Sequence, residues 1–176
     1  RAKGLDKVIV TSDASPIANL AAIGRLDLLR QQFASLLIPE AVAAELRAFS
    51  NAVASDAIRT GIADGWITVQ AVAATARPLV DLLSRELDPG EAEAIALATD
   101  SHADLVLIDE ADGRDVATRL GLAVRGVLGV LLTAKRDGSL PSLAREISRL
   151  RSDAHFFIAA PLEARLLAAA RESTAT

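Results

Sequence analysis

The sequence of 176 residues contains no cysteine and only two histidines. Without cysteine the chain forms no disulfide bond, no thiolate zinc site and no cysteine nucleophile. The two histidines, His102 and His155, are too few for a histidine-rich metal site. Carboxylates are therefore the side chains on which any catalytic or metal chemistry of this chain is expected to rest.

Aromatic residues are scarce at 3%, whereas 51% of the residues are apolar. The core must therefore consist of Ala, Leu, Ile and Val, which favours a sheet packed against alanine-rich helices. No aromatic cluster is present on which nucleic-acid bases could stack. The net charge of −4 excludes a simple basic nucleic-acid binder.

Long hydrophobic runs are also absent: no stretch reaches the roughly 18 apolar residues of a membrane helix, and no signal peptide is visible. We therefore expect a cytoplasmic protein with no membrane partner. The length favours one domain over residues 1–176, since a domain averages about 150 residues. Residues 141–176 are expected to form a helical extension that packs on the sheet domain.

Short apolar runs alternate with segments of helical period, which predicts a parallel sheet with helices on both faces. This is a three-layer α/β/α architecture. The expected strands lie near 8–11, 36–38, 66–69, 105–108 and 122–124. The expected helices lie near 17–29, 40–49, 52–62, 79–86, 89–101, 112–120, 127–136, 142–150 and 162–171.

Two aspartates directly follow predicted strands. Asp13 follows the first strand and Asp109 follows the fourth. Ligands of open parallel sheets bind outside the carboxyl ends of the strands, so these side chains could face one crevice. Each could equally be the N-cap of the next helix, a position that favours aspartate.

Two glutamates occupy unusual positions on predicted helices. Glu45 lies at the edge of an apolar stripe, where a charge is costly unless it is paired, bound to a metal or turned to solvent. Glu91 lies three residues after Asp88, a spacing that also fits a capping box. Glu93 competes with Glu91 for any metal role. Four carboxylates in one place would repel one another without a cation, and oxygen ligands are those that Mg²⁺ and Mn²⁺ prefer.

The segments that carry these acids resemble, in order and spacing, those of PIN-domain proteins. By this resemblance VIVTSDAS supplies Asp13, IPEAVAAEL supplies Glu45, PGEAEAI supplies Glu91 and LVLID supplies Asp109. Most members have aspartate in the third segment, and a threonine in the fourth where this chain has Leu107. The interval of 18 residues between Glu91 and Asp109 fits the family better than an interval counted from Glu93.

The resemblance implies an endoribonuclease that depends on Mg²⁺ or Mn²⁺, in a superfamily that includes many toxins of toxin–antitoxin pairs. It implies Asp13, Glu45, Glu91 and Asp109 as catalytic metal ligands, with Ser15 and Asp112 beside them. The implied partners are RNA, an antitoxin protein and a second copy of the chain in a homodimer. The alternative left open is a PIN-like module that binds RNA or a protein without cleaving it.

The segment from 113 to 151 contains eight basic and three acidic residues, so it is positive within an acidic chain. A basic face beside an acidic pocket would suit a phosphate backbone, although a solvated helix face explains the charges equally well. Arg114 and Lys135 are the predicted RNA contacts. A phosphohydrolase with an aspartate nucleophile is a further alternative, but it would need a second acid where Ser15 stands.

Overall fold

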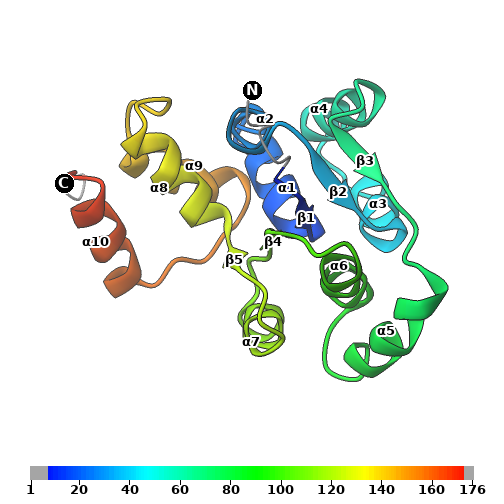
Figure 1. The fold of residues 1–176 in the computed structure, drawn as a ribbon. Coiled ribbons are helices and arrows are strands. Elements are labelled where there is room, and N and C mark those ends of the chain that lie inside the picture. Colours follow the sequence, from blue (N-terminus) through cyan, green and yellow to red (C-terminus); the bar gives the residue numbers. More distant parts are fainter. Residues whose placement is uncertain (1–7, 173–176) are drawn as a thin grey trace, which may run out of the picture.

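Five parallel strands form one sheet at the centre of the molecule (Figure 1). The computed structural model describes residues 8–172. The strand order is β3-β2-β1-β4-β5. The strands are β1 (Val10–Ser12), β2 (Leu36–Ile38), β3 (Ile67–Val69), β4 (Leu105–Leu107) and β5 (Val124–Arg125). All five predicted strands are present, and the parallel sheet is confirmed.

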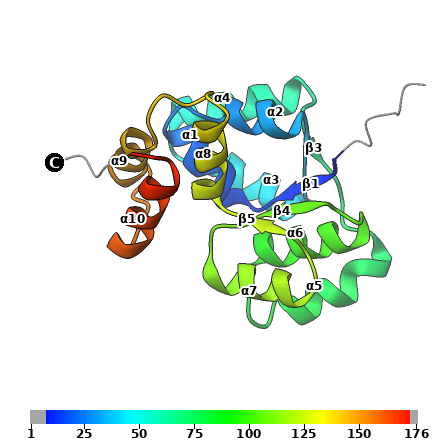
Figure 2. The ribbon, with the colours of Figure 1, turned by 60° about the vertical axis from the view of Figure 1, so that its left-hand side comes forward.

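Helices cover both faces of this sheet, which confirms the three-layer α/β/α prediction (Figure 2). One face is covered by α1 (Ala14–Ala22), α2 (Asp27–Phe33), α4 (Ala52–Ala63) and α8 (Val127–Arg136). The other face is covered by α5 (Arg77–Leu83), α6 (Pro89–Asp100) and α7 (Ala111–Arg119). The remaining helices are α3 (Glu40–Arg47), which packs on α6, and α9 (Leu143–Asp153) and α10 (Ala160–Ala169) near the C-terminus.

Alternate residues of the strands enter two separate cores, as expected for a sheet buried on both faces. On β4, Leu107 joins the core under α1 and α8, whereas Val106 joins the core under α6 and α7. The side chains in both cores are almost all aliphatic, and α6 is buried along most of its length. In place of large aromatic side chains, alanine-rich helices such as α6 fill the space next to the sheet.

The strand order reverses between β1 and β4, which are neighbours although 92 residues lie between Ser12 and Leu105. The backbone N–H of Asp13 donates to the carbonyl oxygen of Leu107 at 2.9 Å, so the two strands end side by side. Chains that leave adjacent strands in opposite directions open a crevice at their carboxyl ends. This topology selects the place where a functional site is expected.

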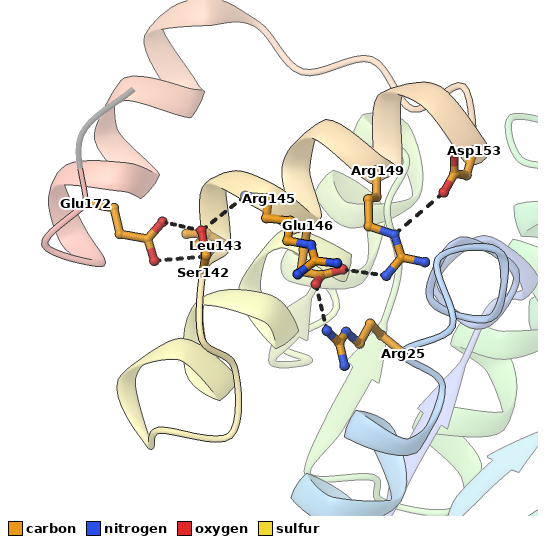
Figure 3. Close-up of polar contacts among 8 residues, drawn as sticks. All are labelled: Arg25, Ser142, Leu143, Arg145, Glu146, Arg149, Asp153 and Glu172. Atoms are coloured by element: carbon orange, nitrogen blue, oxygen red, sulfur yellow. Dashed lines mark hydrogen bonds and ion pairs between the residues drawn. The ribbon is translucent and has the colours of Figure 1, made fainter. Parts of the chain in front are cut away.

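The predicted extension 141–176 packs on the sheet domain through α9, whose Ile147 and Leu150 enter the core under α1 and α8. Residues 1–7 and 173–176 of the predicted domain lie outside the described residues. A buried carboxylate fixes α9: Arg25 donates to Glu146 Oε1 at 2.8 Å, and Arg149 donates to Oε2 at 3.3 Å (Figure 3). Charge pairing and apolar burial therefore hold α9 to the domain together.

The last described residue, Glu172, ties the end of α10 to the start of α9 (Figure 3). Its carboxylate accepts hydrogen bonds at 2.9 Å from the backbone N–H groups of Leu143 and Ala144, which open helix α9. Lys135 near the end of α8 forms an ion pair with the same carboxylate of Glu172 at 2.8 Å. None of the helices within residues 8–172 has the length and apolar character needed to cross a membrane.

Candidate active site

The first acid of the site stands where the strand order reverses. Asp13 follows β1 and is the N-cap of α1, with Oδ2 accepting a 3.4 Å hydrogen bond from the backbone N–H of Ser15. Its side chain is buried, and among the described residues Oδ1 has no hydrogen-bond partner. A helix cap needs only one of the two oxygens, so the second oxygen remains available to a ligand.

Three carboxylates from different segments meet at Gly90, the second residue of α6. A β-carbon on Gly90 would lie 2.9 Å from Asp13 Oδ1, 3.0 Å from Glu45 Oε2 and 3.4 Å from Asp88 Oδ1. The oxygens of Asp13 and Glu45 therefore both lie within 3.0 Å of one point beside Gly90. The fold therefore brings together Asp13 and Glu45, which the sequence predicted as ligands.

Glu91 approaches the same place from the next residue of α6. Its side chain is buried, and Oε1 has no hydrogen-bond partner among the described residues. The carboxylate lies against Gly113 of α7, where a β-carbon would overlap Oε1. Glu93, the alternative ligand, is already engaged: it accepts hydrogen bonds from the backbone N–H of Ala41 and from Arg77. The structure therefore favours Glu91 as the free carboxylate of this helix.

The electrostatics show that these acids share one environment. Burial, followed by the charges of neighbouring acids, raises the pKa of Asp13 and the pKa of Glu91 each to about 7. Burial also raises the pKa of Glu45, as do the charges of Asp88 and Glu110. Carboxylates in such a cluster are neutralised either by protons or by a cation. We call Asp13, Glu45, Asp88, Glu91 and Glu110 the acid cluster.

Asp109, the predicted fourth ligand, is used differently. Val127 at the start of α8 donates its backbone N–H to Oδ1 at 2.6 Å, and Asn19 of α1 donates to Oδ2 at 2.9 Å. Each oxygen thus accepts one hydrogen bond, and together these bonds join α1 to α8. Glu110, the next residue, lies close enough to raise the pKa values of both Glu45 and Glu91 by its charge. Glu110 is exposed, and its charge also raises the pKa of Asp109.

The family comparison agrees with this arrangement of strands and acids. A family model described as a PIN domain matches residues 9–172, which is nearly the whole chain. The chain belongs to the PIN-domain family. No curated protein matches it significantly. PIN domains are commonly metal-dependent nucleases, and the first acid of the cluster in this PIN domain, Asp13, follows β1 where the strand order reverses.

The chemistry of the acid cluster fits the divalent cation on which such nucleases depend. Within residues 8–172 no group of three or more acidic or histidine side chains is arranged closely enough to hold a metal ion. The unpartnered oxygens of Asp13 and Glu91 are nevertheless hard donors, buried without a hydrogen bond, in a cluster of like charges. Mg²⁺ and Mn²⁺ prefer such oxygens and keep several waters, so they need only a few carboxylates from the protein.

The other predicted site residues of this PIN domain are divided between the site and the surface. Ser15 lies beside Asp13 through its backbone N–H. Arg114 is exposed on α7, and its charge lowers the pKa of Asp109 against the stronger effect of burial. Asp112 is exposed and lines a surface pocket with other residues of α7. Lys135 lies at the far end of α8, bound to Glu172 and to the carbonyl of Pro141, so the structure does not bring it to the site.

The sequence analysis missed two members of the acid cluster. Asp88 was identified only as a helix cap, and it does accept a 2.8 Å hydrogen bond from the backbone N–H of Glu91. One signal was available: Asp88 and Glu91 lie within two residues of Gly90, so an acid that approaches this glycine lies near both. For Glu110 the signal was the adjacent pair of acids after β4, since two successive residues leave a strand on opposite sides.

Proposed function

We propose that this PIN domain is a ribonuclease that hydrolyses RNA phosphodiester bonds with the aid of Mg²⁺ or Mn²⁺ held at the acid cluster. The observation that carries the proposal is a pair of buried carboxylate oxygens, Asp13 Oδ1 and Glu91 Oε1. Neither has a hydrogen-bond partner within residues 8–172, and other carboxylates lie near them. Buried charges without partners are costly, and proteins keep them mainly where they serve a function.

We assign the ligand roles to Asp13, Glu45, Glu91 and Asp109, with the charge of Glu110 nearby. Each oxygen of Asp109 accepts one hydrogen bond within the protein and keeps a second lone pair, which can bind a cation. Asp109 also holds the start of α8 against α1, which fixes one wall of the crevice. A bound divalent cation would supply a water of lowered pKa and neutralise charge on the phosphate.

The substrate side of the site is assigned to Arg114. This residue is exposed, and one guanidinium nitrogen lies 3.8 Å from the position of a β-carbon on Gly126, which adjoins Asp109. An arginine at the rim of an acidic crevice can bind a phosphate oxygen through two N–H groups and offset the repulsion between the acids and the nucleic acid. The antitoxin partner and the homodimer stay predictions of the family resemblance.

The test is cleavage of a labelled single-stranded RNA by the purified protein in Mn²⁺, in Mg²⁺ and in EDTA. D13N keeps the shape of the helix cap but removes the charge of a ligand, so we expect cleavage to fall by about 100-fold or more, beyond the usual loss for outer-shell residues. The matched control is D56N, since Asp56 is an exposed acid of α4 that pairs with Arg59. D56N should cleave as the wild type does.

Two results would contradict the proposal. Cleavage that persists in EDTA or in D13N would show that the acid cluster does not carry the reaction. Mn²⁺ binding that D13N abolishes, together with no cleavage of RNA, would instead favour the alternative of a module that binds without cleaving.

A further inference from the structure

Glu93 makes two contacts that no ligand role requires. It follows Glu91 by two residues on α6, and residues at that spacing do not share a helix face. Its side chain is only 12% exposed. Oε2 accepts a 3.0 Å hydrogen bond from the backbone N–H of Ala41, and Oε1 accepts a 2.8 Å hydrogen bond from Arg77. A single carboxylate therefore connects α6 with α3 and α5.

The contact with Ala41 caps helix α3 from outside. The first N–H groups of a helix have no acceptor within the helix, and they carry a partial positive charge. Pro39, the N-cap residue of α3, offers no side-chain acceptor. Glu93 supplies both the acceptor and the negative charge. The start of α3 thus depends on a residue from another helix rather than on its own sequence.

The capped residue Ala41 lies one helical turn before Glu45, a proposed ligand. Glu45 follows Ala41 by four residues, so it projects from the same side of α3 about 6 Å farther along the axis. Glu91 lies on α6, within the same turn as Glu93. The contact therefore fixes the register between the two helices that carry Glu45 and Glu91. The acids of the cluster repel one another, and a contact between the helices resists that repulsion.

We propose that Glu93, held by Arg77, is a positioning residue that keeps α3 and α6 in the register needed for Glu45 and Glu91 to bind one cation. This inference rests on the proposed function. Glu93 does not touch the cation in this account. It sets the separation of two ligands before the cation arrives, which lowers the cost of assembling the site.

The test measures Mn²⁺ affinity directly, by electron paramagnetic resonance of free Mn²⁺ in a titration of the intact protein. We expect E93A to weaken Mn²⁺ binding about tenfold or more, the usual effect of removing a residue that supports a ligand. E93Q retains one oxygen acceptor and should recover part of the affinity. Hydrogen exchange at the amide of Ala41 should accelerate in E93A, which reports the loss of the cap.

The matched control is E163A. Glu163 of α10 also pairs with an arginine, Arg151, and the two side chains are 20% and 42% exposed, close to the 12% and 44% of Glu93 and Arg77. E163A removes a comparable ion pair far along the chain from the acid cluster. It should leave Mn²⁺ affinity within error of the wild type.

The outcomes separate this inference from the proposed function. If D13N abolishes Mn²⁺ binding but E93A leaves it unchanged, the positioning role is wrong and the proposed function stands. An equal loss in E93A and E163A would also overturn the positioning role. If the wild type shows no Mn²⁺ binding that depends on Asp13, the proposed function itself is wrong. Should E93A fail to fold, E93Q and R77Q replace it, and unchanged affinity in both overturns the inference.

Discussion

Replacing Gly113 by alanine tests whether Glu91 needs the space that this glycine leaves. Gly113 is the third residue of α7 and is buried. A β-carbon there would overlap Glu91 Oε1 and would lie 3.0 Å from Glu91 Cδ and 3.1 Å from Ile108 Cγ2. The contact with Ile108 prevents the new methyl group from moving away, so the carboxylate of Glu91 must leave its place.

The expected loss of stability is small. Alanine in a helix is favoured over glycine by about 1 kcal/mol, whereas an extra methyl group in a packed core costs about 1–3 kcal/mol. The net loss is therefore at most about 2 kcal/mol, which lowers Tm by up to about 8 °C in a domain of this size. Mn²⁺ affinity should fall far more, by at least about tenfold, because a ligand is displaced.

The control is G129A, which matches G113A in position and in crowding. Gly129 is the third residue of α8, and a β-carbon there would lie 2.7 Å from Arg125 Cγ, with no carboxylate among its neighbours. Thermal denaturation followed by circular dichroism should show comparable shifts for both variants. Only G113A should lose affinity in the Mn²⁺ titration. Wild-type Mn²⁺ affinity in G113A would refute the assignment of Glu91 as a ligand.

Two further predictions concern the helices near the C-terminus. Although burial alone would raise it, hydrogen bonds and the ion pair with Lys135 lower the pKa of Glu172 to about 2, so E172Q should lose on the order of 3 kcal/mol of unfolding free energy at pH 7. Because the pKa of Glu172 is lower in the folded state than in the unfolded state, the stability difference between wild type and E172Q should shrink as the pH falls from about 4.5 to 2. A stability difference that stays constant over this range in urea titrations would contradict the prediction. R25M should cost about 3 kcal/mol of unfolding free energy, because it leaves the buried carboxylate of Glu146 paired with Arg149 alone among the described residues. E146Q should cost less, because the two arginines that it leaves without this charge are partly exposed to water. A larger loss in E146Q than in R25M, measured by urea denaturation, would refute this reasoning.

The sequence by itself determined the layers of the fold and most of the acids that the site uses. Short β-branched runs and helical periods are local signals, so the five strands and most of the helices could be placed within a few residues. The expected helix 17–29 is instead two helices, α1 and α2, with a break between them. Asp13 was predictable because a polar residue directly after a buried strand faces the edge of the sheet. Glu45 was predictable because a charge beside an apolar stripe needs a partner.

The tertiary structure decided how each of these acids is used. The sequence left Glu91 and Glu93 as alternatives, since both lie on α6 near its start. Only the packing of α6 against α3 shows that Glu93 caps a neighbouring helix while Glu91 has a free oxygen. Asp109 and Glu110 illustrate the same limit, because the N–H of Val127 that binds Asp109 lies 18 residues along the chain.

The basic residues show that a charge pattern alone does not reveal the partners of its members. Lys135 belongs to a positive segment, but its ammonium group is bound to Glu172, which lies 37 residues farther along. A local pattern fixes which side chains a helix or strand presents. Their partners are fixed by the packing of helices and strands that are remote in sequence, and a free carboxylate differs from an engaged one only through those partners.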